Sequence, residues 1–114
     1  MTQINGIALS IREEQADEFE ALFRAEEYPT WLRIAKAGEL LYASLTRVAF
    51  GTHQKDGVRH YLVVAEFKSM TGHTMHDDDP AFDAYNAKAD RFQHEDPLVF
   101  GGYSIARYPE VADS

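Results

Sequence analysis

The segment from Gly72 to Pro80 reads GHTMHDDDP and gathers several side chains that could do chemistry. It places His73 and His76 three residues apart and follows them with three aspartates. Histidine has an unperturbed pKa of about 6.5, so near neutral pH it can act as an acid, a base or a metal ligand. Three roles remain open for the segment: the start of a helix, proton transfer in a pocket, or metal binding.

The start of a helix is the interpretation that the local chemistry favours most. Asp79 and Pro80 match a helix N-cap followed by proline at the first helical position. Asp77 and Asp78 would add negative charge beside the positive end of the helix dipole, and the histidines would lie in a loop. Because His76 would lie in a loop ahead of the cap, we expect it to matter to function more than to stability, and its replacement by alanine to change the free energy of unfolding by no more than about 0.5 kcal/mol.

The proton-transfer interpretation makes His76 and His73 the catalytic candidates. His76 lies nearer the predicted helix and the carboxylates that would orient it. A pair between His76 and Asp78 would favour the imidazolium and raise the pKa of the histidine, which would make it a better acid.

A metal site is the least favoured interpretation of the segment. The H-E-x-x-H signature is absent, so a structural site would need further ligands from elsewhere, such as His53, His60 or His94. We expect neither a metal nor another cofactor.

Aromatic residues near a predicted helix break form a second candidate cluster. Tyr28, Pro29 and Trp31 would wall a ligand pocket on which a flat molecule could stack, or Trp31 would simply be core. Tyr42 belongs to a more polar strand that would line a cavity, or face a partner or solvent. We expect the neighbouring Glu26 and Glu27 to lie on a solvated helix surface.

Composition limits the class of protein. The chain has 114 residues, 45% of them hydrophobic, which is the size of one domain. Acidic residues outnumber basic ones by 19 to 11, and the formal charge of -8 repels nucleic acid and anionic lipid. There is no cysteine and no apolar run near the roughly 18 residues that a membrane span needs. We therefore expect a soluble, cytoplasmic protein with no nucleic acid or membrane partner.

The order of predicted elements is β-α-β-β-α-β. Ser10 and Glu13 match a capping box, so the first helix should begin near Ile11, and Pro29 should end or kink it. Gly38 should close a second short helix. The predicted strands cover residues 3–10, 40–50, 59–68 and 98–108, and the last long helix covers residues 80–93.

This order predicts an α+β, ferredoxin-like fold with a four-stranded antiparallel sheet and helices on one face. Residues 1–108 should form the single domain, and residues 109–114 a disordered tail. The strands are apolar on both sides, so the open face, where we expect Val63 and Ala65, needs a cover. We therefore expect a homodimer packed sheet against sheet.

The element order, the doubly apolar sheet and the helix sequence DPAFDAYNAKADRF make the chain resemble the dimeric α+β barrel superfamily over residues 3–106. That superfamily includes antibiotic-biosynthesis monooxygenases, cyclases, isomerases, haem-handling enzymes and stress-responsive barrels, so the resemblance implies a small-molecule pocket. It also implies a role for Asn5, which matches an asparagine in the first strand. Trp31 lies outside the sheet where some branches have a tryptophan, which argues against haem.

The expected function is binding of a small apolar or aromatic metabolite, with cofactor-independent cyclase, isomerase or monooxygenase chemistry. His76 and His73 would be catalytic. The substrate would contact four further side chains: Tyr28, Trp31, Tyr42 and Asn5. The alternative is a non-catalytic ligand-binding or stress-response module of the same fold.

Overall fold

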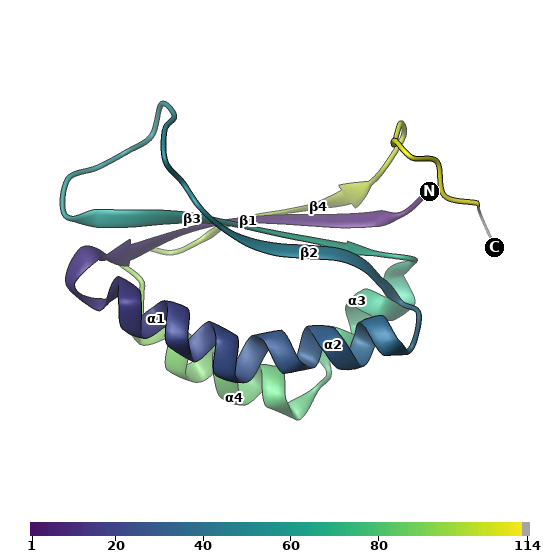
Figure 1. The fold of residues 1–114 in the computed structure, drawn as a ribbon, viewed down its shortest axis with the longest axis horizontal. Helices are drawn as coiled ribbons and strands as arrows, with labels where there is room; N and C mark the ends of the chain where they lie inside the picture. Colours follow the sequence, from purple (N-terminus) through teal and green to yellow (C-terminus); the bar gives the residue numbers. More distant parts are fainter. Residues whose placement is uncertain (113–114) are drawn as a thin grey trace.

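The computed structural model describes residues 1–112, and Figure 1 shows one antiparallel sheet with its helices gathered on a single face. The strand order is β2-β3-β1-β4, and β1 pairs with β3 from Gln3 opposite Phe67 to Arg12 opposite Val58. This architecture confirms the predicted ferredoxin-like fold. The strands are β1 (Gln3–Arg12), β2 (Leu40–Arg47), β3 (Val58–Phe67) and β4 (Leu98–Tyr103).

The helices form two groups below the sheet. The first group is a continuous rod, made of α1 (Ala16–Leu22), the π-helical turn η2 (Phe23–Glu27) and α2 (Tyr28–Lys36), with the 3-10 turn η1 (Glu13–Gln15) before it. The second group is α3 (Met70–Asp77), α4 (Pro80–Ala89) and the 3-10 turn η3 (Asp90–Phe92). The helix α3 is an addition to the predicted order. Within residues 1–112, no helix is long and apolar enough to cross a membrane.

The predicted capping box at the start of the first helix is wrong. β1 continues to Arg12, and no side chain caps η1. Ile11 pairs with Arg59 in the sheet and is completely buried. Burial of an isoleucine contributes about 1.5 to 3 kcal/mol, whereas a cap contributes about 1 kcal/mol, so the strand outweighs the cap.

Pro29 does not end the helical rod. A proline ring inside a helix clashes with the carbonyl group four residues earlier, which here belongs to Ala25. Ala25 lies within the π-helical turn η2, where the wider turn changes the position of that carbonyl. The chain therefore passes from α1 into α2 without a break, and Gly38 ends α2 with a φ of 84°, as predicted.

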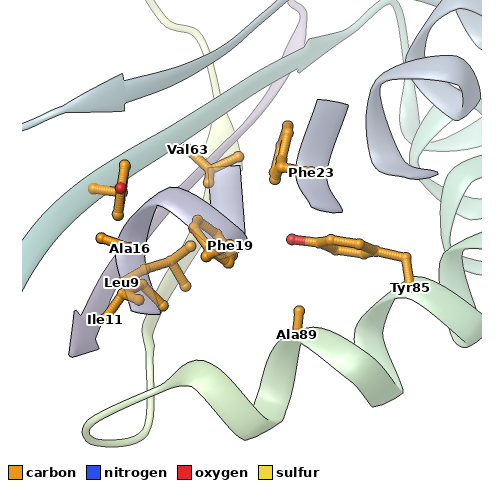
Figure 2. Packing of buried hydrophobic residues seen from close by; sticks show 9 residues of the cluster. Leu9, Ile11, Ala16, Phe19, Phe23, Val63, Tyr85 and Ala89 are labelled. Atoms are coloured by element: carbon orange, nitrogen blue, oxygen red, sulfur yellow. The ribbon is translucent and has the colours of Figure 1, made fainter. Parts of the chain in front are cut away.

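The core lies between the helix-facing side of the sheet and the helices (Figure 2). Leu9, Ile11 and Val63 from the strands meet Phe19 and Phe23 from the helical rod. Val63 therefore faces the helices, and so does Ala65 in a second buried cluster beside Ile34, Leu40 and Phe67. The expectation that Val63 and Ala65 lie on the open face is wrong. The odd-numbered residues of β3 face the helices, and the even-numbered residues face the open side.

The open face of the sheet carries other large apolar side chains. Leu62 alternates with Val63 along β3 and is 42% exposed, and Tyr42 is opposite Glu66 on the same side. Leu98 and Phe100 of β4 lie opposite Ala8 and Gly6 of β1. This surface is free of helices in Figure 1.

The segment after β4 folds back beside the first residues of the chain. The backbone amide of Ser104 donates to the carbonyl of Thr2, and the Arg107 guanidinium donates to the buried Glu66 carboxylate at 2.6 and 2.8 Å. The Arg107 guanidinium holds the pKa of Glu66 below its usual range. The expected strand to residue 108 thus stops at Tyr103, and residues 113–114 of the expected tail lie outside the described part.

Candidate functional site

A cavity of about 390 Å³ lies between the sheet and the helical layer. Its walls are mainly aromatic and aliphatic, and a group of polar side chains gathers on α3 and the helical rod. The volume falls within the range of small-molecule pockets. The aromatic lining residues are Phe19, Phe23, Trp31, Phe67, Phe82 and Tyr85, and the polar ones on the helical side include Glu27, His73, His76 and Asp77.

One stripe of the helical rod supplies a wall of the cavity. Its members recur every four residues: Phe19, Phe23, Glu27 and Trp31. In a regular α-helix a four-residue spacing drifts by about 40° at each step, because a turn takes 3.6 residues. The wider π-helical turn at residues 23–27 counteracts this drift and keeps the stripe facing the cavity.

Glu27 is buried, with 5% of its surface exposed, and the expectation that it lies on a solvated helix face is wrong. Its neighbour Glu26 does lie at the surface, where it pairs with Lys88 at 2.9 Å. The four-residue repeat of the sequence was the available signal for Glu27. In a helix that is α-helical throughout, the drift of about 40° every four residues would rotate Glu27 away from this stripe.

His76 lies inside α3 and is buried, so its expected position in an exposed loop is wrong. Its Nε2 atom lies 3.1 and 3.0 Å from the two carboxylate oxygens of Glu27, and its Nδ1 atom lies 2.9 Å from Oδ1 of Asp77. The imidazole ring packs against Phe82 with 4.3 Å between ring centroids. Because ionised carboxylates only accept hydrogen bonds, both ring nitrogens act as donors when Glu27 and Asp77 are ionised.

Gly72 allows α3 to approach the sheet. A Cβ atom at this position would lie 2.8 Å from the backbone oxygen of Glu39 and 3.0 Å from Cδ1 of Phe67. The helix start is fixed separately by Ser69, whose hydroxyl accepts a hydrogen bond from the amide of Thr71. Close packing of α3 therefore brings its histidines to the cavity.

Burial and the neighbouring carboxylates have opposite effects on the pKa of His76. Burial by itself would lower the pKa of His76, but the hydrogen bonds and charges of Glu27 and Asp77 outweigh it and raise the pKa above its ordinary value. Burial raises the pKa of Glu27, although His76 opposes that change. The two groups therefore hold a proton more firmly than they would in water.

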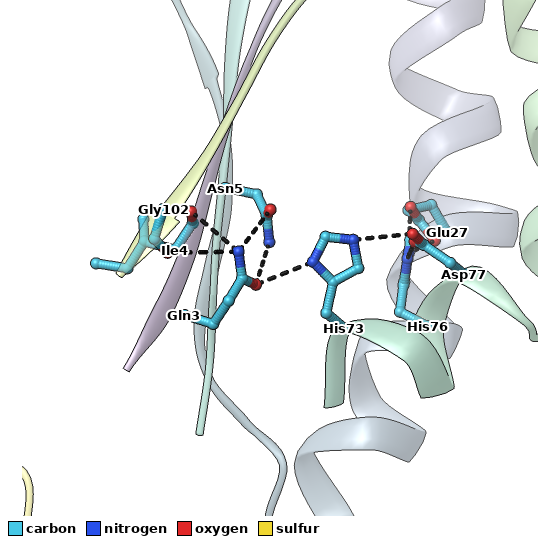
Figure 3. A network of polar contacts seen from close by, with 8 residues as sticks. All are labelled: Gln3, Ile4, Asn5, Glu27, His73, His76, Asp77 and Gly102. Atoms are coloured by element: carbon cyan, nitrogen blue, oxygen red, sulfur yellow. Dashed lines mark hydrogen bonds and ion pairs between the residues drawn. The ribbon is translucent and has the colours of Figure 1, made fainter. Parts of the chain in front are cut away.

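A chain of polar contacts connects this pair with the sheet (Figure 3). Asp77 Oδ2 lies 2.9 Å from Nε2 of His73, and Nδ1 of His73 lies 3.0 Å from the side-chain oxygen of Gln3. Gln3 and Asn5 exchange two hydrogen bonds through their amide groups, at 2.8 and 3.0 Å. The buried start of β1 thus fixes the orientation of the cavity wall.

The predicted helix cap at Asp79 is confirmed. Its carboxylate accepts from the amide of Ala81 at 2.9 Å and from Arg33 at 2.9 Å. The hydrogen bond with Arg33 is the main reason that the pKa of Asp79 lies below its usual range. Segment 72–80 therefore contains the end of one helix and the cap of the next. The predicted pair of His76 with Asp78 is replaced by pairs with Asp77 and Glu27.

The structure brings four of the six predicted site residues to the cavity: His73, His76, Trp31 and Asn5. Tyr28 is 43% exposed at the start of α2, with its ring centroid 6.4 Å from that of Trp31. Tyr42 is 54% exposed on the opposite face of the sheet. Neither Tyr28 nor Tyr42 is among the residues that line this cavity.

Tyr85 and Glu27 are two cavity residues that the sequence analysis did not identify. The Tyr85 ring packs edge-on against Phe23 at 5.6 Å, and Figure 2 shows its hydroxyl directed toward the helical rod. Burial, with the negative charges of Glu27 and Asp90, raises its pKa, so the phenol stays protonated and can donate a hydrogen bond. Among residues 1–112, no group of three or more histidine, aspartate or glutamate side chains is arranged to hold a metal ion.

The sequence matches no known protein-family model and no curated protein. Solved structures do match. Rv0793 from Mycobacterium tuberculosis has a TM-score of 0.75 and 15% identity, over 95% of this chain and 99% of that one. A mutant form of SnoaB from Streptomyces nogalater, a cofactor-independent oxygenase, has a TM-score of 0.66 and 15% identity, over 96% of this chain and 98% of that one.

A third similar structure is an antibiotic biosynthesis monooxygenase, with a TM-score of 0.66 and 16% identity over 93% of this chain and 100% of that chain. The structural neighbours of this chain thus include an antibiotic biosynthesis monooxygenase and a cofactor-independent oxygenase, and the likeness shows that this chain shares their ferredoxin-like α+β fold. At these identities the likeness establishes the fold, and the function has to be argued from the site.

Proposed function

We propose that this protein binds a small apolar or aromatic molecule in the 390 Å³ cavity and catalyses proton transfer on it without a cofactor. The observation that carries the proposal is the contact between Glu27 and His76 on the wall of an aromatic cavity. Titratable pairs with perturbed pKa values concentrate at functional sites. A buried pair of this kind costs free energy to desolvate, and a wholly structural contact between α3 and the rod would not require it.

The pair can accept a proton from a bound molecule and return it. Glu27 is the acceptor, because its raised pKa makes its carboxylate a stronger base than an ordinary one. His76 donates to that carboxylate and holds its orientation, and Asp77 holds His76 from the other side. His73, which shares Asp77, completes the polar wall.

Proton removal is the first step of several reactions that need no cofactor. Removal of a proton next to a carbonyl group or from a phenol leaves an electron pair on the substrate, which can shift a double bond, close a ring or react with oxygen. Isomerase, cyclase and monooxygenase chemistry can all begin in this way. Similarity to a cofactor-independent oxygenase, SnoaB, supports the last of these.

The proposal includes a homodimer formed through the open face of the sheet. Leu62, Leu98 and Phe100 are each 42% to 66% exposed on that face. Soluble monomers rarely expose large contiguous apolar patches, and sheet-on-sheet packing at about 10 Å would remove this one from water. The cavity lies on the other side of the sheet and stays accessible in such a dimer.

Ligand binding without chemistry is the second candidate, and one observation favours it. Both nitrogens of His76 already contact carboxylates, so the imidazole itself has no free nitrogen for a ligand. In that case the polar network would only shape the cavity, and no substrate proton would exchange.

The test is a screen of aromatic ketones and phenols for binding, followed by turnover. Trp31 is the only tryptophan and lines the cavity, so its fluorescence reports binding directly. For a compound that is turned over, we expect Glu27→Gln to lower kcat by about 100-fold or more while KM changes little. Glu26→Gln, one residue away at the surface, should leave kcat unchanged.

Binding with no exchange of a carbon-bound proton of the ligand beyond that in buffer alone, measured by uptake of deuterium from heavy water, would establish the binding module instead. Equal exchange in the wild type and in Glu27→Gln would remove Glu27 from the mechanism. The two results separate the two functions without knowledge of the natural substrate.

A further inference from the structure

The side chains that line the cavity carry an excess of negative charge. Three carboxylates line it, those of Glu27, Asp77 and Asp90, together with His73 and His76. Among the described residues, no lysine or arginine lines it. With the carboxylates ionised, the charge of the lining lies between -3 and -1 for every protonation state of the two histidines.

Basic side chains on the surrounding helices are engaged elsewhere. Lys88 of α4 binds Glu26 at 2.9 Å, and Arg33 of α2 binds Asp79 at 2.9 Å. Neither cation is among the lining residues. The negative charge of the cavity is therefore not neutralised by either of these cations.

The carboxylates of the lining include both buried and solvent-exposed groups. Glu27 is buried, whereas Asp90 and Asn86 are exposed side chains of the lining and mark where the cavity meets solvent. A low-dielectric cleft lined by one sign of charge concentrates the field and attracts the opposite charge. An anion in the cavity would therefore be repelled both by the exposed Asp90 and by the buried Glu27.

The aromatic walls also suit a cation. The faces of Trp, Tyr and Phe rings attract a positive charge when it lies within about 6 Å of the ring centre. Trp31 and Phe23 lie 5.0 Å apart by ring centroid, and Phe23 lies 5.6 Å from Tyr85, so three aromatic rings lie together in the cavity wall.

We propose that the cavity selects molecules with an aromatic or other apolar body and a positive charge, such as a protonated amine, and discriminates against carboxylates. This inference rests on the proposed binding function and adds the class of ligand. When His76 is protonated, its positive charge lies between Glu27 and Asp77, which contact both of its nitrogens. The lining as a whole stays negative, so it attracts a positively charged ligand.

The test uses three probes of nearly equal shape: 2-naphthylmethylamine, 2-naphthylmethanol and 2-naphthoate. They are a cation, a neutral molecule and an anion at about pH 7.5. Binding to the full chain is measured by Trp31 fluorescence and by calorimetry. We expect the amine to bind at least about tenfold more tightly than the carboxylate at low salt, with the neutral probe between them, and the difference to shrink as salt screens the charges.

Two variants distinguish the effect of the charges that line the cavity from the effect of the protein's net charge. Asp90→Asn removes a charge from the lining and should reduce the preference for the amine by about threefold. Asp83→Asn removes a charge from an exposed position on α4 that does not line the cavity, and it should leave the preference unchanged.

Equal affinity for the three probes, or tighter binding of the carboxylate, would overturn the charge selection and leave the proposed binding function standing. Equal effects of the two variants would overturn it as well, because the preference would then come from the net charge of -8. If none of the three probes binds saturably, the proposed binding function itself fails.

Discussion

The Nε2 atom of His76 lies 3.0 Å from a carboxylate oxygen of Glu27, although 49 positions separate the two residues in the chain. One residue comes from a π-helical turn in the helical rod, and the other from a short helix after β3. Both are buried, and the contact closes one wall of the cavity.

Glu27→Ala should lower the free energy of unfolding by about 3 kcal/mol, because it leaves a buried histidine without one of its two carboxylates. Glu26→Ala is the matched control. It breaks an exposed ion pair with Lys88 and should cost less than about 1 kcal/mol. Urea unfolding of both variants measures the difference, and equal losses would show that the contact with His76 contributes nothing particular.

Stability should fall as the pH rises above about 6.5. The folded state raises the pKa of His76, so the folded protein binds this proton more tightly than the unfolded chain does. The contribution is complete below the unfolded pKa and is lost as the pH rises through the folded pKa. Glu27 acts with the same sign, starting at lower pH, because its pKa is also raised.

The pH dependence is measured by urea unfolding between about pH 6 and pH 9, a range that begins just below the ordinary pKa of histidine. We expect His76→Gln to flatten this fall, and His53→Gln, at an exposed loop position, to leave it unchanged. A His76→Gln variant with the wild-type slope would assign the dependence to another group.

Gly72→Ala should destabilise the protein by about 1 to 3 kcal/mol, because the new methyl group overlaps the backbone of Glu39. The loss would occur despite a gain in helix propensity of about 1 kcal/mol from glycine to alanine. Thr71→Ala, at the exposed neighbouring position of α3, should change stability little. A Gly72→Ala variant as stable as the wild type, with unchanged ligand binding, would contradict the close approach of α3.

Much of the fold could be predicted from the sequence, because the strands and the last helix carry strong local patterns. The Asp79 and Pro80 pair specified the start of α4, and the side chain of Asp79 does cap it. Periodicity alone could not place Val63 and Ala65 on the correct face. β3 carries polar residues on both alternations, Arg59 on one and His60 and Glu66 on the other, so its sequence pattern does not mark one solvent side.

The candidate site was predicted only in part. His76, His73 and Asn5 were identified by residue type and by resemblance, and the cavity does gather them. Glu27 was missed because it directly follows the surface residue Glu26, and because its burial depends on a π-helical turn that no local pattern specified. The short helix α3 was missed for a similar reason: Gly72 and two threonines weaken its helical signal.

The dimer should be visible in solution as twice the 12.9 kDa mass of the chain at micromolar concentration, measured by light scattering. Phe100→Lys, on the open face, should shift the mass toward the monomer because a buried lysine would be left without a partner. Leu32→Lys changes a similarly exposed apolar residue on the helical layer and should leave the mass unchanged. A monomeric wild type would contradict the proposed interface.

The central claim is that a ligand in the cavity acts on the pair of Glu27 and His76, and ¹⁵N NMR of the histidine rings tests it most directly. The chain has five histidines, and the spectrum of His76→Gln identifies the signals of His76. An aromatic ligand that quenches Trp31 should shift the ring nitrogens of His76 with the same Kd and change its pKa, while the exposed His53 stays constant. Saturation of the Trp31 signal with no change at His76 would contradict the claim.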